Sequence, residues 1–289
     1  MNFRALKINE VNKWLQLCQE AFSLPLEYFE RHFVNDPNRN HESIFVCEDK
    51  GNLVGSVRVL NREIYYNGQC VKMGGIGEVC TLPDYRGYGI ASSLLKLAIE
   101  YMTENNYQVS VLGSGADKLY ESFGYEHRKL QQKLLKTEMK DYGYIFGPLH
   151  SSQSDQLLVL YRNFSRILNG PIARTPEYFS SWFMAEADLH QSLSIYLDKQ
   201  LIGYVVYNFK EDINILELIL DDGINVDEVL QNLLYHLSSK CMIQLPDVYD
   251  TNLEVVKKIV NHNWMYKNLS ELDYSSVGSS HLIWRLDYY

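Results

Sequence analysis

The sequence lacks a long apolar run, and this absence limits where the protein can act. Its longest apolar stretch, Ile213 to Leu220, is interrupted by Asn214 and Glu217 and is far shorter than the roughly 20 residues that span a bilayer. The first residues run directly into polar positions, without the apolar region of a secretory signal peptide. We therefore expect a protein that is neither inserted into a membrane nor exported.

Paired cysteine motifs are also missing. The five cysteines are scattered, and none forms a Cys-x-x-Cys pair: Cys18, Cys47, Cys70, Cys80 and Cys241. An odd, scattered set predicts free thiols in a reducing compartment, so a cytoplasmic protein is expected. No two of the eight histidines have the close spacing of a zinc-binding helix, and no metal site is predicted.

Basic residues are too few for a nucleic-acid-binding surface. The chain has 27 lysines and arginines against 36 acidic residues, which gives a formal net charge of −9. Such a chain repels a phosphate backbone, and no basic stripe offsets this effect. We expect no nucleic-acid partner, whereas a cationic small molecule or a basic peptide terminus fits the charge. The sequence does not indicate an oligomeric state.

The most informative part of the sequence is residues 71–123, which predict a strand, a glycine turn, a helix, a strand and a short helix. The first strand, Val71 to Leu82, contains three glycines, which mark a bulge or a close approach by another group. The glycine turn leads into a helix whose apolar residues recur at helical spacing, namely Ala91, Leu94, Leu95, Ala98 and Met102. A strand at 107–112 and a helix at 116–123 complete the pattern.

The glycine turn has the properties of an anion site. The first N–H groups of a helix have no helical partner, and the helix dipole adds positive charge at the same point. Gly87 and Gly89 would let the backbone close around a phosphate, and Arg86 can supply a planar fork of donors. Taken alone, the pattern is also consistent with a tight turn that holds no ligand.

Residues 77–91, the following helix and strand, and the segment Leu119-Tyr-Glu-Ser-Phe-Gly-Tyr125 together resemble the GNAT superfamily of N-acetyltransferases. The resemblance extends over about residues 3–135. It implies that the CoA pyrophosphate lies on the backbone amides of the turn Arg86, Gly87, Tyr88, Gly89, Ile90 and Ala91. It also implies that a strand binds the pantetheine arm and the thioester through its backbone, at Val79, Cys80 and Thr81.

The same resemblance suggests chemical roles for two side chains. Tyr120 matches the family tyrosine that protonates the departing CoA thiolate, with a packing aromatic as the alternative. Glu78 lies near the place where several family members carry a catalytic carboxylate, so it is the candidate base for the attacking amine. A structural or substrate-orienting role for Glu78 stays open. Cys80 has no recognisable histidine partner, which favours a buried thiol over a nucleophile.

The second half of the chain echoes the first. Residues 41–55 recur as residues 190–203 with one deletion, and a strand at 213–220, a helix at 226–237, a strand at 242–245 and a helix at 252–261 are expected to follow. This order predicts an α/β (α+β) chain of two tandem GNAT-like domains, 1–137 and 138–289, with mixed central sheets flanked by helices. An unrelated α/β domain in the second half is the alternative.

The second copy differs from the first at the phosphate turn. Asp221 and Asp222 stand there without an arginine, so the turn should repel phosphate. Residues 170–179 resemble the middle domain of the enhanced-intracellular-survival type of GNAT protein, which also pairs an active and a degenerate copy. We therefore expect the first copy to move acetyl from acetyl-CoA directly to a primary amine. The alternative is a non-catalytic acyl-CoA-binding regulatory module.

Overall fold

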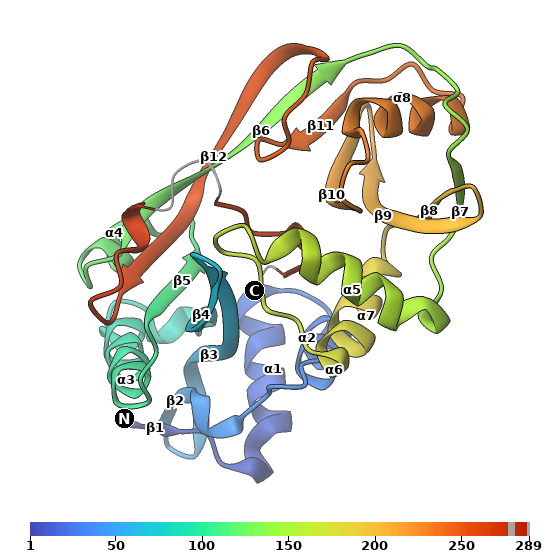
Figure 1. The fold of residues 1–289 in the computed structure, drawn as a ribbon. Helices are drawn as coiled ribbons and strands as arrows, with labels where there is room; N and C mark the ends of the chain where they lie inside the picture. Colours follow the sequence, from blue (N-terminus) through green and yellow to red (C-terminus); the bar gives the residue numbers. More distant parts are fainter. Residues whose placement is uncertain (277–280, 288–289) are drawn as a thin grey trace.

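The computed structural model describes residues 1–276 and 281–287, which form one mixed sheet of twelve strands with helices packed on it (Figure 1). The strand order is β1-β2-β3-β4-β5-β12-β6-β11-β10-β9-β8-β7. The strands are β1 Asn2–Ala5, β2 Ile44–Asp49, β3 Asn52–Tyr66, β4 Gln69–Thr81, β5 Val109–Gly113, β6 Glu126–Lys136, β7 Ile145–Pro148, β8 Gln191–Leu197, β9 Gln200–Phe209, β10 Ile213–Leu220, β11 Ile243–Pro246 and β12 Glu254–Asn268. The predicted fold class is confirmed.

The helices fall into two groups, one in each half of the chain. They are α1 Val11–Phe22, α2 Leu26–Val34, α3 Ile90–Glu104 and α4 Asp117–Glu121, then α5 Ser154–Ser165, α6 Pro176–Tyr178, α7 Met184–Ala187 and α8 Val226–His236. The apolar face predicted for α3 is buried, with Leu94, Leu95, Ala98 and Met102 inaccessible to solvent. Among the described residues, no helix combines the length and the apolar character needed to cross a bilayer.

The hairpin predicted to recur in the second half is present in both halves. The β2–β3 turn and the β8–β9 turn each consist of two residues with positive φ, Lys50-Gly51 and Asp198-Lys199. In the next strand pair, Gly55 lies opposite Thr81 and Gly203 lies opposite Leu220. Counting three residues back from these partners places Glu78 of β4 and Glu217 of β10 at equivalent positions.

The last strand of each half crosses to the other half. Strand β6 pairs with β11, and β12 returns to pair with both β6 and β5, so the sheet runs without a break through the whole chain. Figure 1 shows β6 and β12 as the long ribbons that connect the two parts of the molecule. Because the sheet is continuous, the boundary between residues 137 and 138 stays a prediction.

The helix predicted at residues 252–261 is wrong, because this segment belongs to strand β12. The segment contains Val255, Val256, Ile259 and Val260, and β-branched side chains favour an extended backbone. It pairs with β6 over most of its length, and that long-range pairing decides its conformation.

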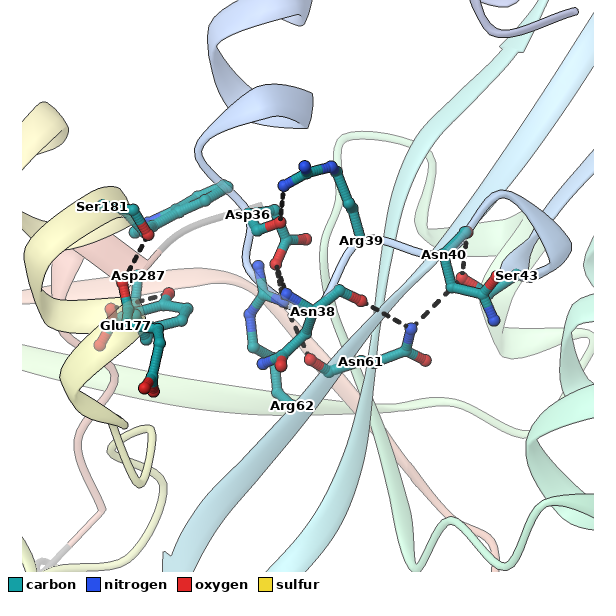
Figure 2. Close-up of polar contacts among 12 residues, drawn as sticks. Asp36, Asn38, Arg39, Asn40, Ser43, Asn61, Arg62, Glu177, Ser181 and Asp287 are labelled. Atoms are coloured by element: carbon teal, nitrogen blue, oxygen red, sulfur yellow. Dashed lines mark hydrogen bonds and ion pairs between the residues drawn. The ribbon is translucent and has the colours of Figure 1, made fainter. Parts of the chain in front are cut away.

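Two clusters of buried ion pairs lie where the two halves meet. Asp36, inaccessible to solvent after α2, accepts hydrogen bonds from Arg58 at 2.7 Å and from Arg62 at 2.9 Å. Figure 2 shows Asp36 and Arg62 side by side in this cluster. The Arg62 guanidinium also lies 5.2 Å from the ring centres of Tyr178 and Trp182, which belong to the second half. Through these cation–π contacts, the cluster connects β3 to the helices of the second half.

A second cluster lies around Arg174, whose guanidinium is fully buried. It forms a bidentate pair with Glu217, with both contacts at 2.7 Å, and a further pair with Asp287 at 2.9 Å. The Tyr178 hydroxyl donates to Asp287 at 3.2 Å, so Tyr178 contacts both clusters. The segment 281–287 is thus held between the two halves of the molecule.

His281 begins that segment and is also buried. Its Nε2 lies 2.8 Å from the Tyr274 hydroxyl. Burial, together with the smaller effect of the nearby positive charge of Arg128, lowers the pKa of His281 to about 3. The imidazole is therefore neutral in the folded protein at neutral pH, whereas the unfolded chain binds a proton below its ordinary pKa of about 6.5.

We expect this histidine to make folding stability fall on acidification. The lowered pKa contributes stability that is complete above about pH 6.5 and is lost progressively towards pH 3. Between pH 7 and pH 5, wild type should lose about 2 kcal/mol of unfolding free energy that a His281→Gln variant does not lose. Urea denaturation at both pH values measures the difference, and equal losses in the two proteins would contradict it.

Candidate active site

Strands β4 and β5 open a wedge in the sheet. They pair in parallel only over Met73–Gly75 and Val109–Val111, so the ends of the strands beyond this stretch are unpaired with each other. A bulge in β4 falls just there, where Glu78 and Val79 lie opposite the single residue Val57. Glu78 has a φ of 41°, a strained conformation for a residue with a side chain. Beyond the bulge, Cys80 and Thr81 pair with β3 again, so the end of β4 stays bound to β3 while its pairing with β5 has ended.

A cavity of about 490 Å³ lies beside the end of β4 and the start of α3. Eight of the nine residues predicted to bind CoA line it: Val79, Cys80, Thr81, Arg86, Gly87, Gly89, Ile90 and Ala91. The ninth, Tyr88, does not line the cavity and is 69% exposed. The structure therefore brings the predicted strand and the predicted turn to one place.

The turn before α3 presents free backbone donors to this cavity. Gly87 and Gly89 have φ values of 84° and 73°, which glycine adopts without strain. Gly89 is the residue before the helix and has no side chain to cap it, so the first N–H groups of α3 have no capping partner. Arg86 fixes the turn to the strand, because its Nε donates to the Thr81 carbonyl at 3.2 Å.

The opposite wall of the cavity was not predicted. It comes from the end of α1, where Ala21 and Phe22 line the cavity, with Tyr85 and Ser92 beside the turn. Phe22 is 41% exposed, and an exposed aromatic residue at a helix end is a weak sequence signal for such a wall.

Glu78 lies at the bulge but does not line the cavity. The Ser56 hydroxyl donates to the Glu78 carbonyl at 2.8 Å, and the carboxylate oxygen Oε1 lies 3.5 Å from Nη1 of the buried Arg58. Arg58 is a contact that sequence analysis missed. Its position inside the apolar strand segment 53–60 was the available signal, because a buried arginine needs an acidic partner. Cys80 is buried, as predicted from the sequence, with its thiol 3.3 Å from the Ser56 hydroxyl.

Tyr120 lies on α4, in the core beneath α3, and is 6% exposed. Burial raises its pKa to about 12. Among the described residues, no group forms a hydrogen bond with the Tyr120 hydroxyl. The neighbouring Tyr125 differs in this respect, because its hydroxyl is 2.7 Å from Ser110 Oγ. Tyr120 does not line the cavity beside β4, so its predicted role stays a prediction.

A known family model matches the part of the chain that contains this site. Residues 2–128 match the family model described as an acetyltransferase (GNAT) domain. This part of the chain is similar to that family, and residues 2–128 are called the GNAT domain below after the model that they match. The cavity, the bulge and the α3 turn all lie within the GNAT domain.

Curated relatives of the GNAT domain include two archaeal proteins. An uncharacterised N-acetyltransferase of Methanocaldococcus jannaschii is 30% identical over 103 residues, which is 34% of this chain and 45% of that protein. An uncharacterised N-acetyltransferase of Archaeoglobus fulgidus is 33% identical over 78 residues, 27% of this chain and 52% of that protein. The chain thus spans about half the length of these curated relatives.

Solved structures resemble the chain beyond the GNAT domain. A GCN5-related N-acetyltransferase from Anabaena variabilis has a TM-score of 0.74 at 17% identity and covers 93% of this chain and 73% of its own. A probable N-acyltransferase from Enterococcus faecalis has a TM-score of 0.76 at 15% identity, covering 93% and 72%. Eis1 from Mycobacterium abscessus has a TM-score of 0.65 at 14% identity, covering 93% and 74%. At these identities the similarity shows a shared fold, and it includes the second half.

The second half has a cavity at the corresponding place, but its chemistry differs from that of the GNAT domain. The turn before α8 carries Asp221 and Asp222, which line this cavity together with Asp227. The Asn225 side chain accepts a hydrogen bond from the Asp227 N–H, so the start of α8 is already capped. Acidic side chains therefore occupy the position where the GNAT domain offers free backbone donors.

Proposed function

We propose that the chain is an N-acetyltransferase that moves acetyl from acetyl-CoA directly to a primary amine. The main support is the uncapped start of α3, which faces the same cavity as Val79, Cys80 and Thr81 of β4. Free N–H groups and the helix dipole suit a pyrophosphate, and the exposed edge of a strand beyond its pairing partner suits the amide groups of pantetheine. The five free thiols, three of them buried, favour a cytoplasmic location for the protein.

The proposed reaction needs two proton transfers. The amine nitrogen attacks the thioester carbonyl carbon and loses a proton, while the carbon–sulfur bond breaks and the thiolate gains one. Glu78 would receive the amine proton, directly or through water, because its carboxylate lies on the bulge at the opening of the wedge. Tyr120 would give its proton to the thiolate, because its hydroxyl has no partner in the described part of the protein.

The acceptor side of the site would lie where α2 meets the second half. Tyr28 of α2 lies there with 41% of its surface exposed, and the partial burial of its phenol raises the pKa, as do the nearby charges of Glu78 and Glu186. Glu186 belongs to α7 and lies 3.4 Å from both Arg31 and His32. Carboxylates from both halves around one aromatic ring suit a cationic amine, either a small molecule or a peptide terminus.

A screen of amines tests this function. The whole chain is incubated with acetyl-CoA and polyamines, amino-acid amides or short peptides with a free amino terminus, and released thiol is measured. We expect thiol release that depends on both substrates, with an acetylated amine detected by mass spectrometry. If CoA binds but no amine releases thiol, the alternative of a non-catalytic acyl-CoA-binding regulatory module would be favoured.

Replacing Gly89 by valine should weaken CoA binding by more than tenfold. A side chain at a φ of 73° is strained, and it would intrude where the backbone must approach the pyrophosphate. Isothermal titration calorimetry gives the affinity, and wild type should bind one CoA per chain. Gly143→Val is the matched control, because Gly143 has a φ of 83° but does not line this cavity.

Two outcomes would contradict this part of the proposal. Unchanged CoA affinity in the Gly89 variant would place the pyrophosphate elsewhere. A second CoA bound per chain in wild type would show that the acidic turn before α8 does not repel phosphate.

A further inference from the structure

A second cavity lies at the crossing between the two halves. Its volume is about 520 Å³, which is within the range of small-molecule sites. One wall comes from β6, a second from β10 and the end of β11, and a third from residues 281–285. It shares no lining residue with the cavity beside α3. Nothing in the proposed acetyl transfer uses it.

Two deeply buried side chains in this cavity have nitrogen atoms without a partner among residues 1–276 and 281–287. Trp284 is 1% exposed and its Nε1 has no hydrogen-bond acceptor, although an indole N–H can only donate. His281 is 8% exposed and its Nδ1 is likewise unpartnered, while its Nε2 is engaged by Tyr274. Buried polar groups are normally satisfied, so these atoms point to an occupant that accepts hydrogen bonds from the Trp284 indole and, with Nε2 accepting from Tyr274, from the Nδ1–H of His281.

The charge around the cavity is positive, in contrast to the net charge of −9 of the chain. Arg128, Lys129 and Arg285 contribute to the lining. Among the described lining residues the one carboxylate is Asp247, and it is compensated by Lys133 at 3.3 Å and Lys258 at 3.8 Å. The cavity therefore favours an anion over a cation.

The remaining lining is largely apolar. Leu216, Pro246 and Ile283 are among the residues that form it, and such a surface favours a compact hydrocarbon body beside the charged group. We propose that this cavity is a second ligand site, which binds a small organic carboxylate with its oxygens towards Trp284 and His281 and its apolar body against β10. Because both halves and the 281–285 segment contribute walls, the bound acid would also stabilise the folded protein.

The test compares three probes of one shape, 3-phenylpropionate, its primary amide and 3-phenylpropylamine. Saturation-transfer NMR and thermal unfolding are measured on the whole chain without CoA, so the result does not depend on acetyl transfer. We expect saturable binding and a rise in melting temperature in the order acid, amide, amine. Absence of saturable acid binding, or stronger binding of the amine, would overturn the proposal.

Variants then locate the binding. Trp284→Phe keeps an aromatic ring but removes the N–H donor, and it should lower the affinity for the acid at least fivefold. Trp14→Phe is the matched control, because Trp14 is also buried with an unpartnered Nε1 but lies in the α1 core, and it should leave the affinity unchanged. Equal effects of the two changes would overturn the proposal.

A surface variant tests the site independently, so the proposal can still be tested if Trp284→Phe does not fold. Lys129→Glu reverses an exposed charge at the cavity and should reduce the preference for acid over amide at least threefold. Lys257→Glu changes an exposed residue of β12 that does not line the cavity, and it should leave the preference for acid over amide unchanged. Displacement of the acid by added CoA would place the probe in the α3 cavity instead and would also overturn the proposal.

Discussion

The Tyr120→Phe variant should have a kcat about 100-fold lower than that of wild type, with nearly unchanged CoA affinity. General acid catalysis by a positioned side chain typically contributes 10²–10⁴-fold, and the hydroxyl acts on the leaving thiolate rather than on bound CoA. Rapid-mixing measurements of thiol release give the chemical step, and calorimetry gives the affinity. A kcat equal to that of wild type, with chemistry rate-limiting, would remove Tyr120 from the mechanism.

Tyr125→Phe is the matched control for this change. The two rings lie 6.0 Å apart, but the Tyr125 hydroxyl is already bound to Ser110, so its loss should affect stability more than turnover. The pH dependence gives a second check. Because burial raises the pKa of Tyr120 to about 12, the phenol keeps its proton through about pH 10, and this group should cause no loss of kcat below that pH.

Arg174→Met should destabilise the protein by about 3–5 kcal/mol, because removing one partner of a buried ion cluster leaves charge without compensation. Both Glu217 and Asp287 would lose their cation, and both are at most 1% exposed. Urea denaturation followed by circular dichroism gives the free energy of unfolding.

The control for Arg174 is its neighbour Arg162. Its half-buried guanidinium donates to the Arg174 carbonyl at 2.9 Å and forms no ion pair with a carboxylate of the described residues, so Arg162→Met should cost less than about 1 kcal/mol. A loss below about 1 kcal/mol for Arg174→Met as well would mean that the two carboxylates are neutralised in another way.

The sequence predicts the parts of the site that depend on neighbouring residues. The strand, the glycine turn and the start of α3 lie within residues 77–91, and a glycine turn before an amphipathic helix has few alternative conformations. The hairpin in each half was predictable for the same reason, because its two strands and its short turn follow one another directly in the sequence.

Features that depend on distant residues were not predictable. Residues 252–261 become a strand because β6 lies beside them, more than a hundred positions earlier in the chain. The contact of Arg58 with Glu78 and the wall formed by Phe22 likewise depend on how separate elements pack. The sequence showed which residues were unusual, such as an arginine within an apolar strand, but not which partner each of them would meet.

The exchange of the last strands has a consequence for synthesis of the protein on the ribosome. When the first 137 residues have emerged, β5 still lacks the neighbour that β12 provides, and β6 still lacks both β11 and β12. The nascent first half therefore exposes unpaired strand edges until residue 268 has been translated, and such edges are prone to mispairing. The sheet becomes complete only when almost the whole chain is available, and a ribosome pause within the second half would prolong the aggregation-prone stage.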